Sequence, residues 1–295
     1  MNLPQTQFYL CRARWRLYLR HDGSLDPSER YSARRRKFLN EGFLYGTNEV
    51  VIQCVFLALM LIAIEIGFRV GRKVDASTEI KAQIAIVEGA LLGVLALLLG
   101  FTMSMAASRF ETRKQLVLDE ANALRTSYLR AQLLPAPEGA DITGLLRRYI
   151  EVRVQYGTSG NDLGTLNDLR TQTERLQMEV WTRTTAYAQK DPNEVTVGFM
   201  LQSLNEAFDL ETARWTAIHN QVPPNVIYVN ALVALLATML VGYAFGLDGR
   251  RNLFSTCVLV LAISMVLAVI IDLDRPRSGF IRANQQPMTD LLHQR

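Results

Sequence analysis

The sequence predicts an all-α membrane protein in which four transmembrane helices form two hairpins, with a helical soluble domain inserted between them. Four stretches are apolar over roughly 20 residues, which is the helical length that crosses about 30 Å of hydrocarbon. Hydrophobic residues make up 49% of the chain and charged residues 20%, and most charges lie outside the four stretches. Residues 108–225 repeat their apolar positions with helical spacing.

The four predicted spans lie at about 50–70, 84–107, 226–247 and 253–273. Helices are expected in all four, because hydrocarbon cannot satisfy exposed backbone groups. The spans divide the chain into five parts: a basic, partly helical membrane-surface leader (1–45), a transmembrane hairpin (46–107), the helical soluble domain (108–225), a second hairpin (226–273) and a C-terminal tail (274–295). For the leader, an interfacial helix and a disordered basic tail both remain open.

Positive charge near the spans predicts the orientation. An even number of spans places both termini and the soluble domain on one side of the membrane. Eleven lysines and arginines lie close to the spans on that side, in 30–37, 109–114 and 275–282. Six lie on the other side, in 69–81 and 250–251. Because cytoplasmic loops carry the excess of Lys and Arg, the termini and the soluble domain are expected in the cytoplasm.

The soluble domain is expected to contain four helices. Apolar stripes with helical spacing occur at 117–128, 145–156, 169–180 and 201–218, separated by clusters of Pro, Gly and Asn. No Gly or Pro lies between Gly100 and Pro135. The second span can therefore continue out of the membrane as one long helix.

The second span carries a line of small residues at helical spacing: Gly89, Gly93, Ala96, Gly100, Ser104 and Ala107. Small residues let helix backbones approach closely, and a Gly-x-x-x-Gly pair is typical of helix packing in membranes. Two interpretations remain open. The line packs within the bundle, or it lines a pore at the axis of an oligomer.

Two carboxylates, Glu65 and Glu88, lie inside predicted spans. An ionisable residue in hydrocarbon is costly and is therefore a candidate functional group. In a hairpin, Glu65 near the end of the first span and Glu88 near the start of the second lie at similar depth. They can flank an ion path, pair with Arg69, Arg72 or Lys73, or reach the membrane surface.

Two charged groups lie at the expected cytoplasmic ends of the spans. Arg109, Arg113 and Lys114 follow the second span and form a candidate basic mouth. After the fourth span, Asp272 and Asp274 precede Arg275 and Arg277. Two carboxylates at this spacing can contribute to a divalent cation site, and with the arginines they can equally form a salt-bridged turn.

Composition argues against several other functions. The three cysteines and three histidines are scattered, without a CxxC pair, so neither a disulfide framework nor a metal site is expected. No GxSxG, HExxH or P-loop occurs. No catalytic residue or cofactor is therefore predicted, and the chain is not expected to be an enzyme. The net charge of +4 beside membrane spans indicates a lipid bilayer rather than nucleic acid as partner.

Several motifs, in order around these spans, resemble a bacterial family of integral membrane proteins called bestrophin-like. The motifs are EGALLG (88–93), GFTMSMA (100–106), SRF (108–110), EANA (120–123), YLR (128–130), DLDRPR (272–277) and QQP (285–287). Bestrophins are pentameric anion channels with four spans per subunit. Their second span lines the pore, and their termini and helical domain are cytoplasmic.

The resemblance implies a homo-oligomeric ion channel of a bacterial inner membrane that passes chloride or other small inorganic ions. The basic mouth fits anions, whereas Glu65 and Glu88 would favour cations. A second hypothesis is a non-conducting membrane scaffold or sensor whose helical soluble domain binds a partner.

Overall fold

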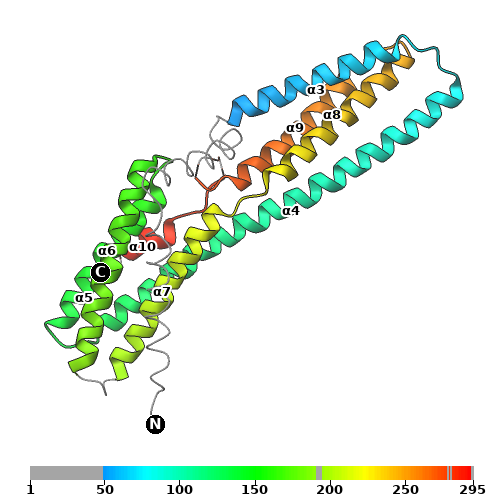
Figure 1. The fold of residues 1–295 in the computed structure, drawn as a ribbon. Helices are drawn as coiled ribbons and strands as arrows, with labels where there is room; N and C mark the ends of the chain where they lie inside the picture. Colours follow the sequence, from blue (N-terminus) through cyan, green and yellow to red (C-terminus); the bar gives the residue numbers. More distant parts are fainter. Residues whose placement is uncertain (1–48, 191–194, 278, 280, 294–295) are drawn as a thin grey trace, which may run out of the picture. The chain divides into compact units, whose positions relative to one another are not determined.

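The computed structural model describes residues 49–190, 195–277, 279 and 281–293. Across these residues every regular element is a helix, which confirms the all-α fold class (Figure 1). The predicted leader lies outside the described residues. The helices are α3 (Glu49–Gly71), α4 (Thr78–Ala131), α5 (Glu138–Thr158), α6 (Leu163–Lys190), α7 (Val195–His219), α8 (Pro224–Leu247), α9 (Leu253–Asp274) and α10 (Gln286–His293).

Four of the described helices are long and apolar enough to cross a membrane, as predicted. They are α3, the first half of α4, α8 and α9. Pro223 and Pro224 separate α7 from α8, and Pro224 occupies the first turn of α8, where a missing N–H is tolerated. This break divides the apolar stretch of α8 from α7.

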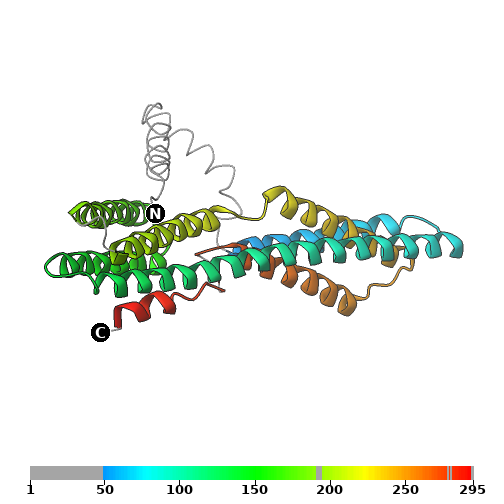
Figure 2. The same cartoon turned by 90° about the horizontal axis from the view of Figure 1, so that it is seen from below.

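Helix α4 is continuous from the membrane into the soluble part of the molecule, as the absence of Gly and Pro predicted. It has 54 residues, which corresponds to about 80 Å of helix. The Ser77 side chain caps its start by accepting from the N–H of Ile80. The helix runs alongside the membrane helices and then alongside the soluble helices (Figures 1 and 2).

The membrane helices pack across the two expected hairpins more than within them. Helix α3 packs mainly against α8, and α4 packs against α8 and α9. A buried polar contact joins α4 to α8, where Asn230 Nδ2 donates to Thr102 Oγ1 at 2.7 Å. Gln53 of α3 also donates to Ser264 of α9, at its hydroxyl and its carbonyl oxygen. The packing thus connects the first and second hairpins.

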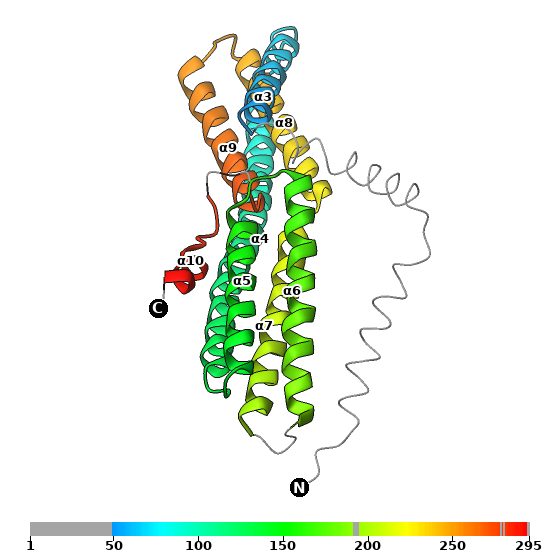
Figure 3. The same ribbon diagram turned by 90° about the vertical axis from the view of Figure 1, so that its left-hand side faces the viewer.

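The second half of α4 packs against α5 and α7, and α6 packs against the same two helices. Four helices therefore lie where the four apolar stripes predicted them (Figure 3). Their core consists of two main clusters along α4, which include the buried residues Val117 and Leu124 in one and Leu146, Met200 and Leu204 in the other. Helix α10 lies against α4 and α5. Residues 49–295 form one compact unit, and the domain boundaries at 107 and 225 stay a prediction.

Candidate functional site

The small-residue line of α4 faces away from the rest of the described chain. All six residues, from Gly89 to Ala107, are exposed. A Cβ atom added at Gly89, Gly93 or Gly100 would find nothing within 4 Å. The opposite face carries Leu95, Leu99, Thr102 and Ala106, which are buried against α8 and α9. We call the exposed side, at positions 89, 93, 96, 100, 104 and 107, the open face of α4.

Close small-residue packing occurs instead between α3 and α8. A Cβ atom on Gly67 would lie 2.0 Å from the Met239 carbonyl oxygen, and one on Gly242 would lie 2.1 Å from that of Ile64. Gly71 and Gly246 face each other one turn further along. We call these four glycines the α3–α8 seam. Both helices carry Gly-x-x-x-Gly, so the signal for the seam was present in the sequence although the prediction missed it.

The two intramembrane carboxylates have different surroundings. Glu65 accepts from Arg69 Nε at 2.8 Å and lies 3.2 Å from Arg251, which precedes α9. The Arg251 guanidinium also stacks on the Phe68 ring at 4.4 Å. Glu88 is half-buried, and no cation of the described residues lies within ion-pair distance of it. The structure thus gives Glu65 a pairing role between α3 and the link from α8 to α9, and it leaves Glu88 as a candidate for ion contact.

The three residues of the predicted basic mouth do not share one surface. Arg113 is buried and donates to the backbone carbonyl of Leu273 at the end of α9. Arg109 donates to Asn220 in the link between α7 and α8. Lys114 is exposed and pairs with Glu111 at 3.2 Å. Two of the three cations therefore attach α4 to neighbouring segments, and Lys114 alone lies on the exposed side.

The acidic turn after α9 binds backbone N–H groups. Both carboxylate oxygens of Asp274 accept from the N–H of Val222, at 2.9 and 3.1 Å. Asp272 accepts from the N–H of Ile281 at 3.0 Å. Arg277 donates to the Tyr156 carbonyl at 3.0 Å, and Arg275 is buried. No group of three or more metal-ligating side chains occurs among the described residues. The hydrogen bonds of Asp272, Asp274 and Arg277 join the turn to neighbouring segments.

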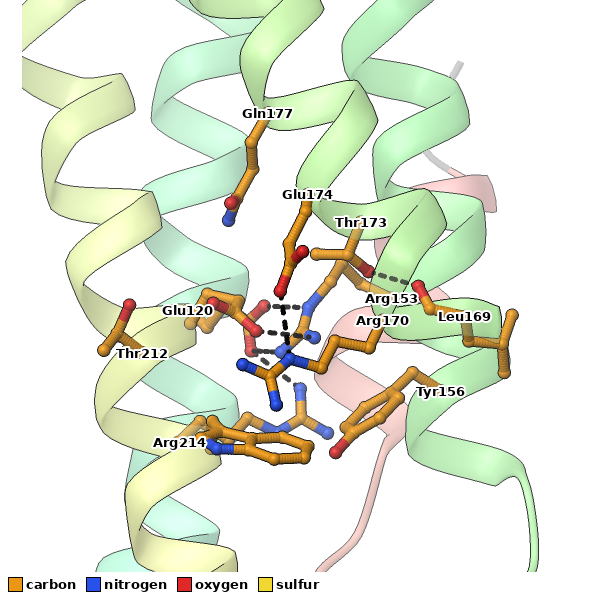
Figure 4. A network of polar contacts seen from close by, with 12 residues as sticks. Glu120, Arg153, Tyr156, Leu169, Arg170, Thr173, Glu174, Gln177, Thr212 and Arg214 are labelled. Atoms are coloured by element: carbon orange, nitrogen blue, oxygen red, sulfur yellow. Dashed lines mark hydrogen bonds and ion pairs between the residues drawn. The ribbon is translucent and has the colours of Figure 1, made fainter. Parts of the chain in front are cut away.

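A buried ionic network holds α4 in the soluble bundle (Figure 4). Glu120 of α4 is fully buried. Its carboxylate accepts hydrogen bonds from Arg153 Nε at 2.6 Å and from Arg153 Nη2 at 3.1 Å. Arg214 Nη1 of α7 donates to the same carboxylate at 2.7 Å. Glu211 lies 3.3 Å from Arg153. One carboxylate on α4 thus joins α5 and α7.

The network sets the ionisation of its members. Burial alone would raise the pKa of Glu120, but the two guanidinium groups lower it below its ordinary value. The pKa of Glu211 is raised, because burial outweighs its attraction to Arg153. Burial also raises the pKa of Tyr149, whose hydroxyl accepts from Gln177 of α6 at 3.0 Å. Glu120 is therefore the firmly ionised centre of the network.

The C-terminal segment attaches to the same network. Gln285 Oε1 accepts from Arg214 Nη2 at 2.5 Å. A Cβ atom on Gly157 would lie 2.3 Å from that oxygen, so the glycine makes room for Gln285. Met288 of α10 is fully buried in the core that α4 and α5 share. The segment after α9 is thereby connected to the long helix.

The bestrophin-like domain model matches residues 54–288 of this chain. Among curated proteins no match was found. The fold is similar to crystal structures of a bacterial bestrophin homolog from Klebsiella pneumoniae. One variant of that homolog shares 16% identity with a TM-score of 0.59, covering 83% of this chain and 96% of the other. A second structure of the homolog shares 16% identity with a TM-score of 0.58, covering 84% of this chain and 100% of the other.

A crystal structure described only as a membrane protein variant is equally similar, with 17% identity, a TM-score of 0.59, and coverage of 83% of this chain and 95% of the other. At these identities the likeness establishes the fold, and the matched domain model, which spans most of the chain, establishes the family. Four apolar helices long enough to cross a membrane agree with both. The chain is a multi-pass α-helical membrane protein and belongs to the bestrophin-like family.

Proposed function

We propose that this protein is an oligomeric ion channel of a bacterial inner membrane, that it conducts anions, and that the open face of α4 lines the path. The open face itself carries the proposal. It is uncovered along the whole span, while the other side of the same helix is buried. Membership of a family named for bestrophins, which are pentameric anion channels, supports the same function.

Small side chains suit the centre of a ring of helices. When several copies place this face toward a common axis, glycine, alanine and serine leave space where leucines would close it. The bulky Phe101 lies beside the open face and is 65% exposed. A path lined in this way would be wide at the small residues and would narrow near Phe101.

The attachments of α4 support a fixed lining. Within the membrane, Thr102 is bound to Asn230, and below it Arg113 is bound to the end of α9. In the soluble bundle, Glu120 is bound to α5 and α7. All three contacts lie on the packed side of α4, so they hold the helix without covering its open face. We propose the termini and the soluble bundle in the cytoplasm, and no catalytic role.

Flux measurements test the proposal. Purified protein in liposomes is expected to pass halide faster than empty vesicles. Gly93→Leu on the open face should reduce the flux, because it fills the path. Gly144→Leu on α5 is the matched control, since Gly144 also has nothing within 4 Å of an added Cβ. Wild-type flux equal to that of empty vesicles would contradict the proposal.

A scaffold or sensor without conduction is the second candidate. The same six small residues favour it in one respect, because they allow helices of neighbouring copies to touch directly and seal the axis. An oligomer structure separates the two candidates. A continuous axial opening along α4 supports the channel, and direct contact of α4 helices along the whole span supports the scaffold.

A further inference from the structure

The open face of α4 continues beyond the membrane in helical phase. From Ala107 the same side of the helix is reached at positions 111, 114, 118, 122, 125 and 129, in steps of three and four residues. All six of these positions are exposed. The side that includes Val117, Glu120 and Leu124 is buried. One uncovered line therefore runs from the membrane along the soluble half of α4.

Charge on the soluble part of this line is uneven. Glu111 and Lys114 pair with each other at 3.2 Å and cancel. Leu118, Asn122 and Leu129 are neutral. Arg125 is the next ionised residue, and within the described residues no carboxylate lies within ion-pair distance of it. Each copy of the chain thus contributes about one net positive charge to this line.

We propose that Arg125 determines the ion selectivity of the path, by forming a ring of positive charge at its water-filled end. This inference rests on the proposed function, because it requires α4 to line a path. Arg125 lies 18 residues after Ala107, which places the ring about 27 Å beyond the membrane end of the open face. There the ring raises the local concentration of anions and lowers that of cations before either enters the membrane.

The position of Arg125 distinguishes it from other exposed cations of the soluble bundle. Arg147 lies on α5 and is close to Glu151, at 3.7 Å. Arg148 is exposed on the same helix and is therefore not part of the line that α4 presents. Because surface charges separated by more than about 10 Å are screened in 0.1 M salt, a charge on the line of α4 is expected to act in the path more strongly than a charge on another helix.

The test is the relative permeability of chloride and potassium in planar bilayers containing the full-length protein, from the reversal potential in a salt gradient. Arg125→Gln is expected to lower the chloride preference at least about twofold at low salt, and Arg125→Glu to lower it further. Arg125→Lys should keep it. In about 1 M salt, where the screening length is about 3 Å, the difference should shrink.

Arg148→Gln is the matched control, because it removes an exposed arginine from α5 without changing α4. Size-exclusion elution of each variant checks assembly. A conducting Arg125→Gln channel with the wild-type permeability ratio would overturn the inference and leave the proposed function intact. A wild-type protein that passes no ions would overturn both.

Discussion

Two sets of glycines in the same membrane bundle have opposite surroundings. At the α3–α8 seam, an added Cβ would lie within 2.4 Å of a backbone oxygen at each of the four positions. On the open face of α4, an added Cβ at Gly89, Gly93 or Gly100 would meet nothing. Both sets have the spacing of one helix face. The spacing therefore predicts a helix face without side chains. It does not predict whether another helix of the same chain packs against that face.

The two sets of glycines are expected to affect different properties of the protein, folding for the seam and conduction for the open face. Residues of the seam bring two backbones into contact, so substitutions there act on folding. Residues of the open face have no packing partner among the described residues, so substitutions there should change the proposed ion path beside α4 and not the folding of the chain.

A bulky residue in the α3–α8 seam should destabilise the protein more than loss of the Glu120 carboxylate or a methyl group on the open face. Gly242→Val would force α3 away from α8, because the added atoms overlap the Ile64 backbone. Little folded protein should survive extraction in detergent, measured by size-exclusion chromatography. Gly93→Val is the control on the open face and should elute as wild type. Equal yields of folded protein for the two variants would contradict the difference in packing between the α3–α8 seam and the open face of α4.

Removal of the Glu120 carboxylate is expected to have the next largest effect. Glu120→Gln leaves Arg153 and Arg214 buried with reduced compensation, which costs about 3–5 kcal/mol when one partner of a buried pair is lost. The thermal unfolding temperature in detergent should fall clearly. Glu111→Gln, which breaks an exposed pair on the open side of α4, should change it little.

The two carboxylates of the network should respond to pH in opposite ways. Glu120 has a lowered pKa, so the stability that it provides is present above pH 4.5 and is lost as pH falls through its lower folded pKa. Glu211 has a raised pKa, so protonation as pH falls toward 4.5 adds stability. Unfolding temperatures of Glu120→Gln and Glu211→Gln between pH 7 and 3 measure this.

In that experiment Glu120→Gln should lose less stability than wild type at the acid end. Glu211→Gln should lose the gain that wild type shows on approach to pH 4.5. Parallel pH profiles of both variants and wild type would contradict the ionisation states assigned to the network.

A single methyl group on the open face should change stability very little. Gly100→Ala adds a Cβ in empty space and improves helix propensity, so stability should stay equal or rise by at most about 1 kcal/mol. Gly71→Ala puts the same group 2.3 Å from the Tyr243 carbonyl oxygen and should lower the unfolding temperature. A loss of stability for Gly100→Ala would mean that the open face is packed tightly in the assembled protein.

The fold could be predicted because its signals are local. Span length, helical periodicity and the run without Gly or Pro between Gly100 and Pro135 each determine an element without knowledge of its neighbours. The partners of the helices could not be predicted in this way. Gly67 and Gly242 have the same spacing signal as Gly89, and sequence spacing does not say which helix lies opposite.

The candidate site was predicted only in part, because sequence order does not say on which side of a helix each residue lies. Residues 109 and 113 are one turn apart and share the packed side of α4, whereas Lys114 lies on another side. A basic cluster in sequence is therefore divided in space. Glu120 was noticed only as part of a family motif, because its partners Arg153 and Arg214 are 33 and 94 residues away. Long-range ion pairs of this kind leave no local pattern.

If the open face of α4 lines an ion path, a cysteine at position 104 should be accessible from the water in that path. The cysteine is introduced as Ser104→Cys after Cys11, Cys54 and Cys257 are replaced by alanine. A charged, water-soluble thiol reagent is then added during halide efflux from liposomes. The reagent is expected to modify this cysteine and to block the flux. Full halide flux through protein that is modified at position 104 would contradict it.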